Sequence, residues 1–190
     1  LLTALQHYDK SISTYKVGHG QIIEAPILAY LIETANGRIL YDVGCDHRKI
    51  NHGPLREQYF NQKQFPNGAP EMSEEHRIPY HLARLGLTPA DVDVIFVGHL
   101  HWDHAGGLKE LRHCGCGAEI HLQQDEWEHA PADLNVFADD LLDDQGKTLP
   151  FKLHQGEYEV VPGVHAIATP GHTAGHMSMW IELPKGPPVL

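Results

Sequence analysis

The chain has 190 residues, of which 42% are hydrophobic and 21% are charged, and its formal net charge is −11 with histidine counted as neutral. This length predicts one domain over residues 1–190 with a core of its own, and no apolar run is long enough to span a bilayer. The acidic balance disfavours nucleic acids and anionic membrane surfaces as partners, because both are bound through lysine and arginine side chains that neutralise phosphate.

The first predicted elements lead into an antiparallel hairpin. Residues 14–17 indicate a short strand, and the apolar residues 27–32 indicate a buried one. Asn36-Gly37 is a strong signal for a hairpin turn, so residues 38–44 are expected to return as the partner strand. Asp42 lies near the end of that strand, where its carboxylate is placed either to accept an N–H from a ligand histidine or to cap a turn.

Residues 45–71 break this pattern and are rich in Asn, Gln, Gly and Pro, with Tyr59, Phe60 and Phe65 among them. Long aperiodic loops in compact domains usually have a function. The aromatic residues therefore predict a lid or a pocket wall, with simple packing beneath the loop as the alternative.

A helix and a strand are predicted next. Ser73 is a good N-cap, apolar residues recur at helical spacing over 78–85, and Gly86 ends the element. Pro79 lies deeper than the first helical position, so the helix is expected to begin late or to bend. Residues 91–97 then predict an interior strand, whose carboxyl end is where open α/β sheets place ligands.

Short helices and strands alternate over the rest of the chain. Residues 131–146 are acidic and predict a solvated loop or helix. The pattern indicates an α/β or α+β fold with a mixed sheet. The remaining predicted helices are 108–111 and 123–130, and the remaining strands are 118–122, 151–153, 158–161, 164–168 and 177–183.

The stretch that carries chemistry is His99-Leu-His101-Trp-Asp103-His104, directly after the predicted strand. Side chains that alternate along extended backbone point the same way, so His99, His101 and Asp103 are expected to converge, and a turn adds His104. Imidazole and carboxylate groups are the ligands of zinc and similar divalent ions. A histidine-rich surface loop is the alternative, but the spacing and the following Gly106-Gly107 favour a dinuclear metal site.

The chain contains three cysteines, Cys45, Cys114 and Cys116, and an odd number predicts reduced thiols rather than a disulfide framework. Reduced thiols fit a cytoplasmic location. The chain begins without Met, so we expect the native N-terminus, with or without a targeting segment, to lie upstream of Leu1.

The histidine motif is followed by two glycines and, further on, by Pro170-Gly171-His172-Thr173. This combination resembles the metallo-β-lactamase superfamily, and the resemblance covers nearly all of the chain. Within that superfamily the chain is most similar to the N-acyl homoserine lactonases, through residues 72–78, 85–91 and 156–164 as well as the motif. The resemblance implies a four-layer αβ/βα sandwich of two similar halves. The second half is expected to be incomplete, with an exposed apolar edge near residues 177–183.

The resemblance also implies the ligands of two divalent metal ions, most simply zinc. His99, His101 and His172 would hold the first ion, and Asp103 and His104 would help to hold the second. The family has a bridging aspartate and a final histidine beyond the point where this sequence stops, so the second site is expected to lack ligands in this chain.

The implied activity is hydrolysis of the lactone ring of N-acyl homoserine lactones, which is quorum quenching. A metal-bound water supplies the nucleophile, and Asp103 passes a proton to the departing alkoxide. The alternatives are a thioesterase of the glyoxalase II kind, another ester or lactam hydrolase, or a catalytically incomplete fragment. A serine hydrolase is disfavoured because the chain has no Gly-x-Ser-x-Gly elbow.

Several supporting residues and the assembly are also predicted. Tyr59, Phe60 and Phe65 are candidate contacts for an acyl chain, and the Trp102 ring is expected near the mouth of the pocket. His176 is expected to support the structure or a ligand rather than to bind metal. The expected partner is a small-molecule lactone, and a homodimer is an open prediction.

Overall fold

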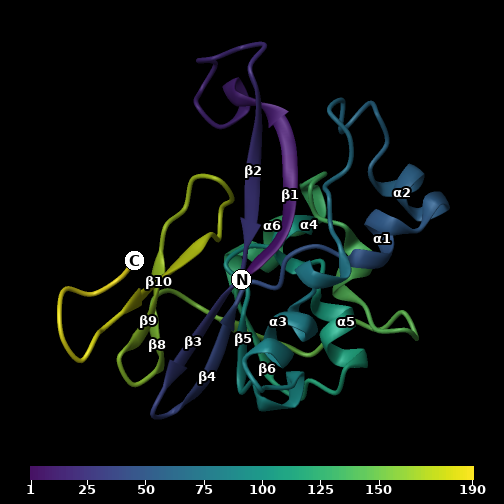
Figure 1. Cartoon of the computed structure of the whole chain (residues 1–190). Helices are drawn as coiled ribbons and strands as arrows, with labels where there is room; N and C mark the ends of the chain where they lie inside the picture. The colour runs from purple at the N-terminus through teal and green to yellow at the C-terminus, as the bar shows by residue number, and fades with distance from the viewer.

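The centre of the computed structural model, which describes residues 1–190, is a five-stranded sheet with the order β3-β4-β5-β6-β7 (Figure 1). β3 and β4 form the hairpin predicted around Asn36-Gly37, and the other neighbouring strands run parallel. The carboxyl ends of the parallel strands therefore meet at one edge of the sheet, where α/β folds bind ligands. The strands are β3 (Tyr30–Thr34), β4 (Gly37–Tyr41), β5 (Val94–Phe96), β6 (Glu119–Gln123) and β7 (Phe151–His154).

Helices cover one face of this sheet, and a core cluster of 19 buried residues lies between the two layers. Leu82 on α3 and Leu108 on α5 are fully buried there against Ile95 and Ile120 of the sheet. The helices are α3 (Ile78–Arg84), α4 (Trp102–Ala105), α5 (Leu108–His113) and α6 (Gln124–His129), with short 3-10 turns η2 (Glu74–His76), η3 (Pro89–Asp91), η4 (Ala130–Ala132) and η5 (Ala138–Leu141).

A second sheet with the order β10-β9-β8 packs on the other face of the five-stranded sheet (Figure 1). Phe96 of β5 and Met177 of β10 belong to the apolar cluster between the two sheets. The structure thus has the predicted mixed α/β class, with a helix layer followed by two sheets. β10 is an edge strand, on which Trp180 is 39% exposed. The strands are β8 (Tyr158–Val161), β9 (Val164–Ala168) and β10 (Met177–Ile181).

The N-terminal strands form a separate hairpin that projects above the main sheet (Figure 1). β1 (Leu2–Asp9) and β2 (Ile22–Leu28) pair antiparallel, and the 3-10 turn η1 (Lys10–Ile12) begins the connection between them. The predicted strand at 14–17 is wrong, because these residues lie in the turn and Tyr15 has a left-handed φ of 44°. The buried strand predicted at 27–32 is divided between β2 and β3.

The segment predicted as one long loop, residues 45–71, contains two short helices, so that prediction is wrong in part. α1 (His47–Asn51) begins at Asp46, whose carboxylate accepts from the backbone N–H groups of Arg48 and Lys49. α2 (Gly53–Tyr59) has Pro54 in its first turn. Both are ordinary helix-start signals, but each helix is too short to show a periodic apolar stripe.

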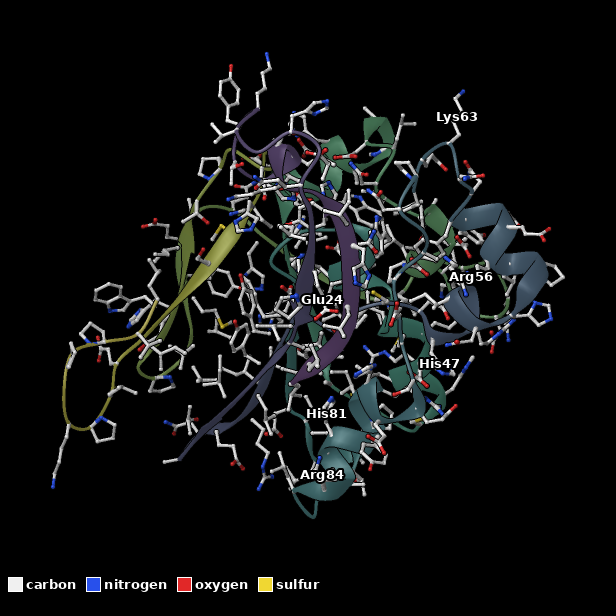
Figure 2. The ribbon with its side chains drawn as sticks, turned by 45° about the horizontal axis from the view of Figure 1, so that its top comes forward. Glu24, His47, Arg56, Lys63, His81 and Arg84 are labelled. Atoms are coloured by element: carbon white, nitrogen blue, oxygen red, sulfur yellow. The ribbon has the colours of Figure 1, made fainter.

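Polar side chains on the outside of this segment face solvent, with Arg56 and Lys63 exposed (Figure 2). The helix predicted after Ser73 begins late, as expected from Pro79, which lies in the first turn of α3. None of the helices combines the length and the apolarity that a membrane crossing requires.

Candidate metal centre

The predicted metal ligands follow the carboxyl end of β5. Residues 97–101 continue from this strand in irregular backbone, and His101 is the N-cap of α4, which places Asp103 and His104 in one helical turn. His172 comes from the loop that joins β9 to β10. The site is therefore built from two chain segments that meet at the end of the central sheet.

The five residues predicted as ligands lie together in two overlapping groups. His99, His101 and His172 form one group, and His99, Asp103 and His104 form the other. In each group the ligand atoms lie within 4.8 Å of one another. The ring centroids of His99 and His172 are 4.8 Å apart, and those of His101 and His172 are 4.7 Å apart.

His99 is the residue that most clearly fits a cation. It is 2% exposed, and neither Nδ1 nor Nε2 has a hydrogen-bond partner. Burial, reinforced by the neighbouring histidines, lowers the pKa of His99 far below its usual range, so the ring is neutral. A buried neutral imidazole with a free lone pair is costly unless something binds it, and a divalent ion is such a partner. Three imidazoles, with a carboxylate beside them, match the donor preference of zinc.

Asp42 supports His104 from the end of β4, as predicted. Its Oδ2 lies 2.7 Å from His104 Nδ1, and its Oδ1 accepts from the Gly98 backbone N–H at 2.8 Å. Burial acts to lower the pKa of His104, but the charge and hydrogen bond of Asp42 outweigh it and raise that pKa to about 9. This contact directs Nδ1–H toward Asp42, so a divalent ion that displaced the other proton would bind at Nε2.

Asp133 supports His101 in the same way, and the sequence reasoning missed it. His101 Nε2 lies 2.8 Å from Asp133 Oδ2, and His101 Nδ1 faces His172 Nε2 at 3.1 Å. Asp133 lies in the acidic stretch predicted as a solvated loop. The only sequence pattern that marks Asp133 is Asp133-x-Asn135, which is typical of a turn. In this turn the Asp133 carboxylate accepts from the Asn135 backbone N–H at 2.8 Å.

His176 lies beside the cluster but outside both ligand groups. Its Nδ1 lies 2.8 Å from Thr169 Oγ1, and its ring centroid is 5.0 Å from that of His99. His176 therefore packs against the candidate ligands and bonds to the loop that carries His172.

A cleft of about 840 Å³ opens from the ligand cluster, with Asp103 and His172 in its wall. Phe65, Trp102 and Phe137 give this wall an aromatic character, and no Lys or Arg lines it. The cleft extends to the tip of the N-terminal hairpin. The arrangement suits a ligand with a polar end at the histidines and an apolar tail.

Two of the three predicted aromatic contacts, Tyr59 and Phe60, do not line this cleft and pack beneath the loop, which is the alternative prediction. Phe60 is 6% exposed and packs edge-on beneath Trp102, with ring centroids 5.3 Å apart. Tyr59 packs against Phe137 and the buried Lys49 ammonium, which lies 4.1 Å from the Tyr59 ring centroid. Of the three, Phe65 alone reaches the cleft.

Comparisons with known proteins agree with this geometry. A family model described as the metallo-beta-lactamase superfamily matches residues 23–186. An N-acyl homoserine lactonase from Bacillus sp. is 38% identical over 171 residues, which are 90% of this chain and 64% of that protein. An N-acyl homoserine lactonase from Bacillus cereus is 36% identical over 182 residues, 96% of this chain and 68% of that protein. The chain thus spans less than two thirds of the first of these relatives.

Solved structures give the same result. A quorum-quenching N-acyl homoserine lactone lactonase superposes with a TM-score of 0.78 at 32% identity, covering 99% of this chain and 69% of that one. An N-acyl homoserine lactone hydrolase, solved with N-hexanoyl-L-homoserine at its catalytic metal center, gives a TM-score of 0.80 at 31% identity, covering 98% and 73%.

Proposed function

Since this chain belongs to the metallo-β-lactamase superfamily, we propose that it is a metal-dependent hydrolase that opens the lactone ring of N-acyl homoserine lactones. The observation that carries the proposal is the pair of overlapping ligand groups, of which Asp103 and His172 line the cleft. This activity would make the protein a quorum-quenching enzyme.

His99, His101 and His172 would hold one divalent ion, and Asp103 and His104 would help to hold a second; zinc is the ion that this donor set favours. Support comes from the unpartnered nitrogens of His99 and from the carboxylates that fix His101 and His104. Bound divalent ions supply a nucleophile from water near neutral pH and polarise the ester carbonyl.

The other steps belong to residues of the chain. Asp42 keeps the proton of His104 on Nδ1, and Asp133 orients His101, so both rings are held before substrate arrives. The Asp103 carboxylate is partly exposed and lies in the cleft wall. From there it would carry a proton to the alkoxide oxygen that leaves when the lactone ring opens.

The cleft also supports the substrate class. An acyl homoserine lactone has a compact polar head and an uncharged tail, and Trp102, Phe65 and Phe137 offer the tail an apolar wall. The absence of Lys and Arg from the lining favours an uncharged ester over an anionic substrate. The names of the curated relatives favour a lactonase over a thioesterase.

The test is a comparison of substrates on the purified, zinc-loaded chain. Proton release on ring opening of N-hexanoyl and N-decanoyl homoserine lactones is measured beside hydrolysis of a thioester and a β-lactam. The proposal expects the lactones to be turned over with the highest kcat/KM. A zinc-loaded protein that hydrolyses the thioester or the β-lactam and leaves the lactones intact would contradict it.

A cytoplasmic location and a homodimer also belong to the proposal. Cell fractionation tests the first, and the mass measured by light scattering tests the second.

A further inference from the structure

Glu126, on the first turns of α6, is a buried carboxylate that none of the steps above uses. It is 2% exposed, and no basic side chain forms an ion pair with it. An ionised carboxylate in such a position requires several hydrogen-bond donors, because burial of an unpaired charge is very costly. The donors that satisfy Glu126 come from the two segments that carry the candidate metal ligands.

On one side, Glu126 holds the segment that follows β5. Its Oε1 accepts from the Leu100 backbone N–H at 2.9 Å. Leu100 lies between His99 and His101 in the chain, so this bond fixes the backbone from which both imidazoles project. Figure 1 shows α4 and α6 at the same end of the central sheet.

On the other side, Glu126 holds the loop between β9 and β10. Its Oε2 accepts from Thr173 Oγ1–H at 2.6 Å and from the Gly175 backbone N–H at 3.2 Å. Thr173 directly follows His172. The loop lies directly on α6, because a Cβ atom on Gly175 would come within 2.1 Å of the Glu126 backbone nitrogen.

We propose that Glu126 is a positioning residue of the metal centre, whose carboxylate sets the spacing between the His99–His101 segment and the His172 loop. The inference rests on the metal site of the proposed function. A backbone hydrogen bond from Met177 N–H to the Gly98 oxygen at 3.0 Å also joins the two segments. Glu126, however, bonds the residues next to the ligands themselves, Leu100 and Thr173, so the geometry of the three-histidine group depends on its carboxylate. Groups that orient metal ligands through hydrogen bonds affect metal affinity about 10- to 100-fold when they are changed.

The test compares Glu126→Gln with Glu128→Gln, which makes the same charge change at an exposed position of the same helix. A glutamine keeps the size of the side chain but replaces one acceptor oxygen with an amide NH₂, which cannot accept from the backbone N–H of Leu100 or of Gly175. Zinc affinity is measured by competition with a chromogenic chelator, and the ligand field is read from the absorption spectrum of the cobalt-substituted protein. We expect about 10- to 100-fold weaker zinc binding and an altered cobalt spectrum for Glu126→Gln. We expect neither change for Glu128→Gln.

Thr173 provides a second variant in case Glu126→Gln does not fold. Thr173→Val removes one donor and keeps the shape, and Thr173→Ser restores the hydroxyl. We expect Thr173→Val to weaken zinc binding and Thr173→Ser to recover it. Wild-type zinc affinity in folded Glu126→Gln or Thr173→Val, with only a lower melting temperature of the metal-free protein, would overturn the inference. Failure of the proposed function would look different, because a wild-type chain that binds zinc without opening the lactones would contradict that function alone. A wild-type chain that binds no zinc would overturn both.

Discussion

The contact between Asp42 and the ligand candidate His104 gives the sharpest mutational prediction. Asp42 is 4% exposed and has a left-handed φ of 60°, which asparagine also tolerates. In Asp42→Asn the amide oxygen accepts from one of the two donors, Gly98 N–H or His104 Nδ1–H, and the amide NH₂ faces the other. A buried donor left without an acceptor costs about 1–3 kcal/mol. We therefore expect the free energy of unfolding to fall by about 1–3 kcal/mol.

The same change releases the orientation of His104, so we also expect zinc affinity to fall by about 10- to 100-fold. Stability is measured by urea unfolding of the metal-free protein, and affinity by chelator competition. The matched control is Asp93→Asn, because Asp93 also accepts from a backbone N–H, that of Arg38, but is exposed. If Asp42→Asn matched the wild type in both stability and zinc affinity, the assignment of Asp42 as the support of His104 would be refuted.

Three further predictions concern other parts of the molecule. In the folded protein, burial lowers the pKa of His154 to about 4, from the usual value of 6.5. As the pH falls from about 6.5, the unfolded chain therefore binds a proton at His154 before the folded protein does. The wild type should therefore lose stability between these pH values, and His154→Phe should lose less in urea titrations at each pH; equal losses would contradict this. Gly107→Ala should lower the free energy of unfolding by about 1–3 kcal/mol relative to the control Gly117→Ala. A Cβ atom on residue 107 would lie 2.3 Å from the backbone oxygen of Val43, whereas nothing lies near a Cβ on residue 117. Equal melting temperatures of the two variants would refute the close approach. Trp102→Ala should reduce kcat/KM more for N-decanoyl than for N-hexanoyl homoserine lactone, because the ring lines the cleft; a uniform reduction would place the acyl tail elsewhere.

The parts of the fold that could be predicted from the sequence have a strong local signal. The Asn36-Gly37 turn specifies a hairpin by itself, and an apolar strand that ends in a histidine motif specifies both an interior strand and the place of the candidate ligands. The short helices of residues 45–71 could not be recognised in the same way. Their start signals at Asp46 and Pro54 are present, but each helix is only one or two turns long and shows no apolar period.

The supporting residues of the site were harder to predict because their partners are distant in the chain. Glu126 and Asp133 lie in segments whose local pattern indicates an ordinary surface helix and an acidic loop, and they become functional candidates only when the fold brings two loops against them. Lys49 is similar, since its ammonium is buried between the carboxylates of Asp139 and Asp140 at 2.9 and 2.6 Å. The hydrophobic period of a segment indicates which face of a helix or strand a residue lies on, but not which distant residue it contacts.

The proposed lactone hydrolysis depends on metal ions bound by the histidine cluster of this chain. The most direct measurement is a zinc titration of the metal-free protein, with ring opening of N-decanoyl homoserine lactone followed by proton release. We expect no activity before zinc is added, and activity that rises with bound zinc and saturates when the site is filled. Full activity in the metal-free protein, or zinc saturation without ring opening, would contradict the account.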